Sequence, residues 1–132
     1  MKLTLSGRVE RGEGMATSLG CPTANIAVEQ GVLIPGLGVY VGEARVDGEL
    51  HYALICISDG RTGYNLKMEV HLLGVDRDLI GKHIDVVLHE KLRDTIPFPG
   101  EKEMAVMIAK DLEQARLWAA TQMVAQKSFP NY

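Results

Sequence analysis

The chain has 132 residues, of which 46% are hydrophobic and 23% charged, and this fits one globular domain over residues 1–132 with no second core. Its net charge of −3 and pI near 5.8 argue against nucleic acid or an anionic membrane as partners. The sequence has two separated cysteines, no zinc-binding histidine pattern and no apolar run of the roughly 18 residues that span a bilayer. Its start does not resemble a signal peptide, so we expect a cytoplasmic protein and take it to be a monomer.

Glycines cluster near the start of the chain. Gly7, Gly12, Gly14 and Gly20 precede the motif Cys-Pro-Thr-Ala-Asn at residues 21–25. Glycine lets backbone amides approach a ligand that a β-carbon would hold off, so such a loop could cradle phosphates. The spacing matches neither a P-loop nor a dinucleotide fingerprint, and a flexible turn between two strands is the commoner meaning of this pattern.

Two oxygen-bearing side chains follow this loop. Thr23 and Asn25 lie two positions apart, so in an extended segment both would point to the same side. Hard oxygen donors suit Mg²⁺, which often takes its remaining ligands from water and substrate phosphates. A turn with a local side-chain hydrogen bond would produce the same residues and stays open as an alternative.

A hairpin is predicted in the middle of the chain. Residues 39–46 and 49–57 are apolar-rich runs separated by Asp47 and Gly48. This dipeptide supplies the positive φ angles that a tight hairpin turn requires.

Two further strands are indicated by alternating apolar and polar residues. The positions expected to face inward are Leu66, Met68, Val70 and Leu72 in residues 66–73, and Ile84, Val86 and Leu88 in residues 83–89. The outward positions are Lys67, Glu69 and His71 in the first strand, and His83, Asp85 and His89 in the second.

One of these outward residues has the chemistry of a general base. Glu69 could accept a proton from a substrate hydroxyl, and Lys67 or His71 on the same face could orient it. A solvated strand face would look identical in sequence. Arg93, expected in a loop after the strand that ends near Lys91, has a planar fork suited to a phosphate or a carboxylate.

The last third of the chain changes to a helical period after the turn at residues 97–100. Acidic residues open it, and its apolar positions are Met104, Ile108, Leu112, Ala115 and Ala119. Pro130 cannot continue the helix. A run of strands closed by one helix favours an all-β barrel or an α+β sandwich over a doubly wound sheet.

Taken in order, these motifs resemble the riboflavin kinase family, which includes the kinase module of bacterial FAD synthetases and the free-standing eukaryotic enzyme. The resemblance covers roughly residues 5–120. The matching positions are Gly7, residues 12–14, residues 19–26, Pro35, residues 38–40, residues 68–73, residues 81–82, residues 92–94 and Phe98.

The resemblance implies a closed six-stranded antiparallel, Greek-key-like β-barrel with a C-terminal α-helix. It also implies ATP and riboflavin as substrates, Mg²⁺ as cofactor, and FMN and ADP as products. By the same resemblance, Glu69 is the general base, Thr23 and Asn25 hold the metal, and Arg93 and Phe98 lie beside the flavin. The residues that it assigns to the nucleotide are Gly12, Gly14, Gly20, Pro22, Thr23 and Asn25. We expect the oxygens of Thr23, Asn25 and Glu69 to converge in one pocket at the mouth of the barrel.

The sequence departs from the family at three places. Residues 15–18 lack the usual basic side chains, residues 58–65 replace the usual Asn-Pro-Thr segment, and Ile80 stands in place of an aromatic residue. Two alternatives therefore stay open: a catalytically degenerate module that binds a flavin or nucleotide without turnover, and a kinase for another small alcohol or phosphate donor.

Overall fold

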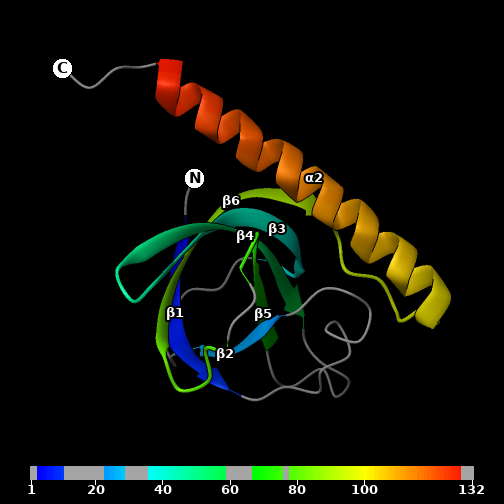
Figure 1. Ribbon diagram of the computed structural model, residues 1–132. Coiled ribbons are helices and arrows are strands. Elements are labelled where there is room, and N and C mark those ends of the chain that lie inside the picture. The colour runs from blue at the N-terminus through cyan, green and yellow to red at the C-terminus, as the bar shows by residue number, and fades with distance from the viewer. Residues whose placement is uncertain (1–2, 11–22, 29–35, 59–66, 76–77, 129–132) are drawn as a thin grey trace.

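The computed structural model describes residues 3–10, 23–28, 36–58, 67–75 and 78–128. Six strands and one long helix make up this part of the chain (Figure 1). They are β1 (Leu3–Glu10), β2 (Ala24–Val28), β3 (Gly38–Val46), β4 (Glu49–Ser58), β5 (Lys67–Leu72), β6 (His83–Arg93) and α2 (Glu101–Ser128).

The six strands close into a barrel in the order β1-β2-β5-β4-β3-β6, and every neighbouring pair is antiparallel. Closure occurs between β1 and β6, where Leu3 lies opposite Leu88 and Arg8 opposite His83. A closed barrel leaves no unpaired strand edge. The predicted six-stranded antiparallel barrel with a C-terminal helix is therefore confirmed.

The residues of β5 and β6 that alternation predicts to face inward fill part of the barrel, and predicted Leu66 lies outside the described residues. In β5, Met68, Val70 and Leu72 are at most 4% exposed. In β6 the inward residues are Ile84, Val86 and Leu88, all in the same core cluster. The connection between β5 and β6 adds Leu79 to this cluster, with Val75 packed against it.

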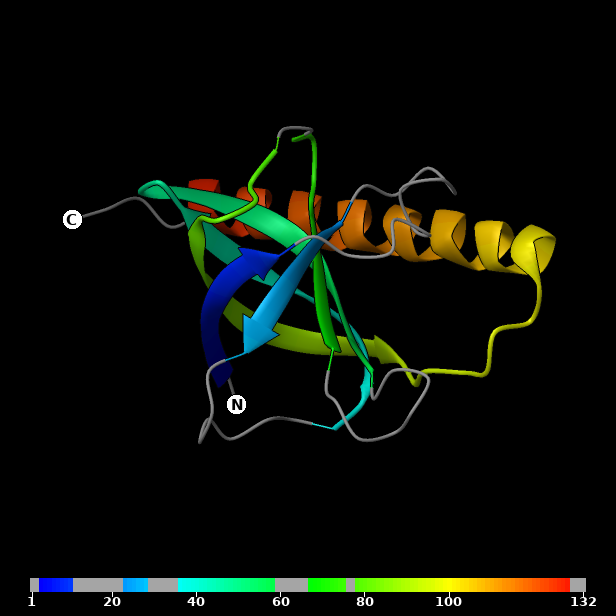
Figure 2. The ribbon, with the colours of Figure 1, turned by 90° about the horizontal axis from the view of Figure 1, so that it is seen from below.

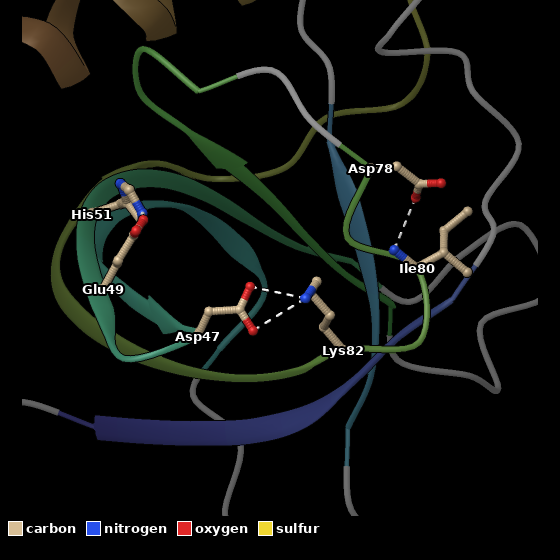
Figure 3. A network of polar contacts seen from close by, with 6 residues as sticks. All are labelled: Asp47, Glu49, His51, Asp78, Ile80 and Lys82. Carbon is tan, nitrogen blue, oxygen red and sulfur yellow. Dashed lines mark hydrogen bonds and ion pairs between the residues drawn. The ribbon is translucent and has the colours of Figure 1, made fainter.

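The β3–β4 hairpin turns at the predicted dipeptide. Asp47 and Gly48 have φ angles of 53° and 77°, the left-handed values that this tight turn needs. The Asp47 carboxylate also pairs with Lys82, whose Nζ lies 2.9 Å from its Oδ2 (Figure 3). The backbone at Lys82 in turn bonds β1, since the Val9 amide donates to the Lys82 carbonyl at 2.9 Å. Three segments distant in sequence are thus joined at this end of the barrel.

Helix α2 packs along the outside of the barrel and extends past it (Figures 1 and 2). Its predicted apolar positions form the contact: Leu112, Ala115 and Ala119 are buried, and Met104 and Ile108 are half-buried. Leu112 and Ala115 join Val39, Val41 and Leu54 of the barrel wall in a second apolar cluster, which lies outside the barrel core. Within the described residues, no helix combines the length and apolarity that crossing a bilayer demands.

Gly42 in β3 has no room for a side chain. A β-carbon built at Gly42 would lie 2.0 Å from the Val87 carbonyl oxygen of β6, and a backbone atom cannot swing aside. We expect Gly42→Ala to lower the free energy of unfolding by about 1–3 kcal/mol through overpacking. Gly36→Ala is the matched control, because nothing lies within 4 Å of the added carbon. Equal denaturant midpoints for the two variants would contradict this account.

Candidate functional site

Three of the candidate residues come together on the outer wall of the barrel. Asn25 of β2 and Glu69 of β5 are direct cross-strand partners. The hydroxyl of Thr23, which immediately precedes β2, donates a long hydrogen bond of 3.5 Å to Oε2 of Glu69. The neighbouring positions Ile26 and Met68 point into the core, so Asn25 and Glu69 face outward. The three groups thus meet on the outer face of the barrel wall, near the end of β1 and the start of β2.

A continuous row of cross-strand partners extends from this point around the barrel. Residues of such a row share one face of the sheet, so their side chains line the same outer surface. Across β1, β2, β5, β4, β3 and β6 the row comprises Glu10, Asn25, Glu69, Cys56, Val39 and Arg93. Glu69 and Arg93 therefore lie along one row of the wall, with Cys56 and Val39 between them.

Cys56 is the cross-strand partner of Glu69 on β4. Burial raises the pKa of its thiol to about 11, and the nearby Glu69 carboxylate acts in the same direction while Arg93 opposes it. The thiol is therefore protonated and uncharged at neutral pH, and is not an activated nucleophile. Sequence reasoning missed this residue because its apolar context gave no sign of its position beside Glu69.

Arg93 is the last residue of β6, not part of a following loop as predicted. Its Nε and Nη2 donate to the two carboxylate oxygens of Asp111 in α2 at 2.9 and 2.8 Å, and its Nη1 donates to the Asp94 carbonyl at 3.0 Å. Hydrogen bonding to Asp111 raises the pKa of Arg93. The fork thus holds a carboxylate of the protein itself, one of the two partners that the sequence suggested.

Asp111 was not among the candidate residues, although its place among the apolar positions of the helix indicates a buried carboxylate. It is 5% exposed and lies between Ile108, Leu112 and Ala115 on the packed face of α2. A carboxylate on the apolar stripe of a helix is almost never buried without a partner. The helical spacing of its apolar neighbours is therefore the signal that points to an ion pair at this position.

Phe98 lies in the segment between β6 and α2 and is 52% exposed. It shares the segment with Ile96, which is 46% exposed. Both are large apolar residues, and the segment begins directly after Arg93. Both side chains are therefore accessible to solvent.

His71 differs from the expectation for the polar face of β5. It is 8% exposed and lies opposite Leu54, which belongs to the apolar cluster beneath α2. The outer face of β5 is therefore not uniformly solvated, because the helix covers part of the neighbouring wall. Lys67 and Glu69 on the same face remain partly exposed.

Some of the predicted nucleotide-binding residues lie outside the described part of the chain. They are Gly12, Gly14, Gly20 and Pro22. The departures at residues 15–18 and 59–65 also lie outside it, whereas Ile80 is described and is 52% exposed.

The oxygen-bearing side chains Thr23, Asn25 and Glu69 suit Mg²⁺ if water and substrate phosphates supply its other ligands. Among the described residues, no group of three or more His, Cys, Asp or Glu side chains could hold a metal ion by itself. The side chains here carry hard oxygen donors: the Thr23 hydroxyl meets the Glu69 carboxylate, and Asn25, which carries an amide oxygen, is the cross-strand partner of Glu69. They fit a cation that takes its other ligands from water and a substrate's phosphates, as Mg²⁺ does.

The sequence and fold both match known proteins. The family model for flavokinase, described as riboflavin kinase, matches residues 1–119. The bifunctional riboflavin kinase/FMN adenylyltransferase of Escherichia coli K12 is 37% identical over 115 residues, which cover 85% of this chain and 36% of that protein. The chain thus spans little more than a third of the length of such curated relatives.

Two crystal structures share the fold. The riboflavin kinase of Trypanosoma brucei has a TM-score of 0.69 and 20% identity, covering 99% of this chain and 92% of that one. A macrolide-efflux protein of Streptococcus pneumoniae has a TM-score of 0.79 and 23% identity, covering 86% of this chain and 38% of that one. These two likenesses concern the fold alone. The family match over residues 1–119, on a closed barrel that joins Thr23, Asn25 and Glu69, shows that this chain belongs to the riboflavin kinase family.

Proposed function

We propose that this chain transfers the γ-phosphoryl group of ATP to the 5′-hydroxyl of riboflavin, giving FMN and ADP. The observation that carries the proposal is the meeting of three oxygen-bearing side chains from β2, the residue before it and β5, with Thr23 Oγ1 3.5 Å from Glu69 Oε2 and Asn25 directly opposite Glu69. The family match supports riboflavin as the acceptor. Phosphoryl transfer mainly requires positioning and charge neutralisation, so a small set of such groups is sufficient.

Glu69 is the general base in this proposal. Its carboxylate takes the proton of the riboflavin hydroxyl as that oxygen forms a bond to the γ-phosphorus. The bond between the γ-phosphorus and the oxygen bridging it to the β-phosphorus breaks at the same time, and ADP leaves with that oxygen. The neighbouring Cys56 thiol is uncharged, so it neither competes for this proton nor attacks the phosphorus.

Thr23 and Asn25 would hold Mg²⁺ and the nucleotide phosphates. The bound metal would neutralise charge on the phosphates during transfer. The role of the protein residues is to fix that end of the nucleotide beside Glu69, which the β2–β5 pairing keeps in line with them. We also assign Gly12, Gly14, Gly20 and Pro22, which precede β2 in the sequence, to the nucleotide.

Riboflavin would lie toward the Arg93 end of the row of cross-strand partners. We assign Phe98 to the flavin ring, because it is exposed on the segment that begins directly after Arg93. Arg93 was predicted to lie beside the flavin, but its guanidinium bonds to Asp111 and the Asp94 carbonyl, so we assign it to the support of that segment. A monomeric, cytoplasmic protein remains our expectation from the sequence. A flavin- or nucleotide-binding module without turnover, suggested by the absence of basic residues at positions 15–18, is the alternative outcome.

The first prediction tests the base. With riboflavin, ATP and Mg²⁺ the protein should produce FMN, and Glu69→Gln should lower kcat about 10²–10⁴-fold because an amide cannot accept the proton. Chromatographic separation of FMN from riboflavin measures this. Glu90→Gln, at an exposed position of β6, is the matched control and should retain the wild-type rate.

Two results would count against this assignment. Wild-type protein that quenches riboflavin fluorescence without forming FMN from any nucleoside triphosphate would favour the binding module. Turnover that Glu69→Gln leaves unchanged would remove Glu69 from the role of base.

The second prediction concerns the metal. Thr23→Val keeps the shape of the side chain and removes its oxygen, so the Mg²⁺ concentration for half-maximal rate should rise about tenfold, equivalent to about 1.4 kcal/mol of binding. Thr121→Val serves as the control, because that hydroxyl donates to the Leu117 carbonyl within α2. An unchanged Mg²⁺ dependence in Thr23→Val would show that its hydroxyl does not bind the metal.

A further inference from the structure

The segment that joins β6 to α2, residues 94–100, is stiff and carries exposed apolar side chains. Ile96 and Phe98 are 46% and 52% exposed, and each is followed by a proline. A following proline keeps a residue out of the helical region and holds it extended. The two side chains are therefore presented by a chain segment with few conformations of its own.

Both ends of this segment are fixed. At its start, Asp94 pairs with Lys91, whose Nζ lies 2.6 Å from its carboxylate, and the Asp94 carbonyl accepts a hydrogen bond from Arg93. At its end, Gly100 has a φ of 111°, which favours glycine, and its carbonyl accepts the amide of Met104 in the first turn of α2. These contacts fix the two ends of the segment, but they do not fix the position of α2 relative to β6.

The contact between Arg93 and Asp111 sets that position. It is a two-pronged ion pair with distances of 2.9 and 2.8 Å, and the Asp111 side chain is only 7% exposed. Such planar pairs fix orientation as well as distance. Asp111 lies ten residues into the helix, or about 15 Å along its axis at 1.5 Å per residue. The end of β6, residues 94–100 and the first turns of α2 therefore form a loop of chain that the Arg93–Asp111 ion pair closes.

From this geometry we infer that Asp111 is a positioning residue for the acceptor: by holding Arg93 it fixes the segment on which Ile96 and Phe98 contact the planar ring of riboflavin. The inference rests on the proposed function for the identity of the acceptor. A rigid receiving surface loses less conformational entropy when the ligand binds, so the ion pair contributes to riboflavin affinity without touching riboflavin. The nucleotide end of the site lies on β2 and β5. It is held by the pairing of these strands and does not depend on the Arg93–Asp111 ion pair.

The test separates the two substrates. Asp111→Asn keeps the shape of the side chain and removes its charge, and we expect the riboflavin KM and the Kd from fluorescence quenching each to rise about tenfold. The KM for ATP and kcat should change less than about twofold, since neither depends on the segment. Asp111→Glu restores the carboxylate and should recover part of the lost affinity.

Leu112→Ala is the matched control for a general loosening of the helix. Leu112 is buried beside Asp111 and packs on the barrel wall, but takes no part in the ion pair. We expect it to lower the thermal midpoint while leaving riboflavin affinity at the wild-type value. Far-ultraviolet circular dichroism will establish that each variant is folded before its affinity is compared.

The outcomes are distinct. A folded Asp111→Asn with wild-type riboflavin affinity would overturn the role of Asp111 alone, and so would an equal loss of affinity in Leu112→Ala. Wild-type protein that neither phosphorylates nor binds riboflavin would overturn the proposed function, and this inference with it. Should Asp111→Asn fail to fold, Asp111→Glu provides the test. A folded glutamate variant has an ion pair to Arg93 of altered geometry, so it should bind riboflavin more weakly and ATP as the wild type does.

Discussion

The pairing register between β2 and β5 is the constraint on which the site depends. Because side chains alternate across a strand, a slip of one residue would turn Glu69 into the core and Met68 outward. Burial of a side chain such as Ile26 or Met68 is worth about 1.5–3 kcal/mol. A typical hydrogen bond contributes only about 0.5–1.5 kcal/mol, and the Thr23–Glu69 contact is long. The apolar core therefore decides the register, and the polar groups meet outside as a consequence.

The outer wall of the barrel has two adjoining areas. Part of it is apolar and is covered by α2, and the remainder carries polar groups that stay partly exposed. Asp111 and Arg93 lie where the two areas meet. Loss of one partner of such a pair would leave a buried charge without compensation, which is strongly destabilising. The pair is tolerated within an otherwise apolar helix contact because each charge is compensated by two hydrogen bonds to the other.

Local patterns in the sequence were sufficient for part of the fold, whereas the closed six-stranded barrel was predicted from the family resemblance. The alternation in residues 66–73 and 83–89 identified the inward faces of two strands, and Asp47-Gly48 located the hairpin. The resemblance to a known family pointed to Thr23, Asn25 and Glu69, which no spacing rule would have joined. The burial of His71 and the pairing of Arg93 with Asp111 were not predicted. Both depend on which part of the outer wall the helix covers, and this is decided by packing between segments far apart in sequence.

Cys56 has a role in this arrangement that follows from its charge rather than its reactivity. It is the direct partner of Glu69, and its thiol also experiences the opposing charge of Arg93 farther along the row. A carboxylate at this position would repel Glu69, and a lysine would pair with it. A small thiol with a pKa of about 11 does neither, and it packs against the apolar layer under α2. Among the described residues, Arg93 is bound to Asp111, and the Glu69 carboxylate accepts its hydrogen bond from Thr23.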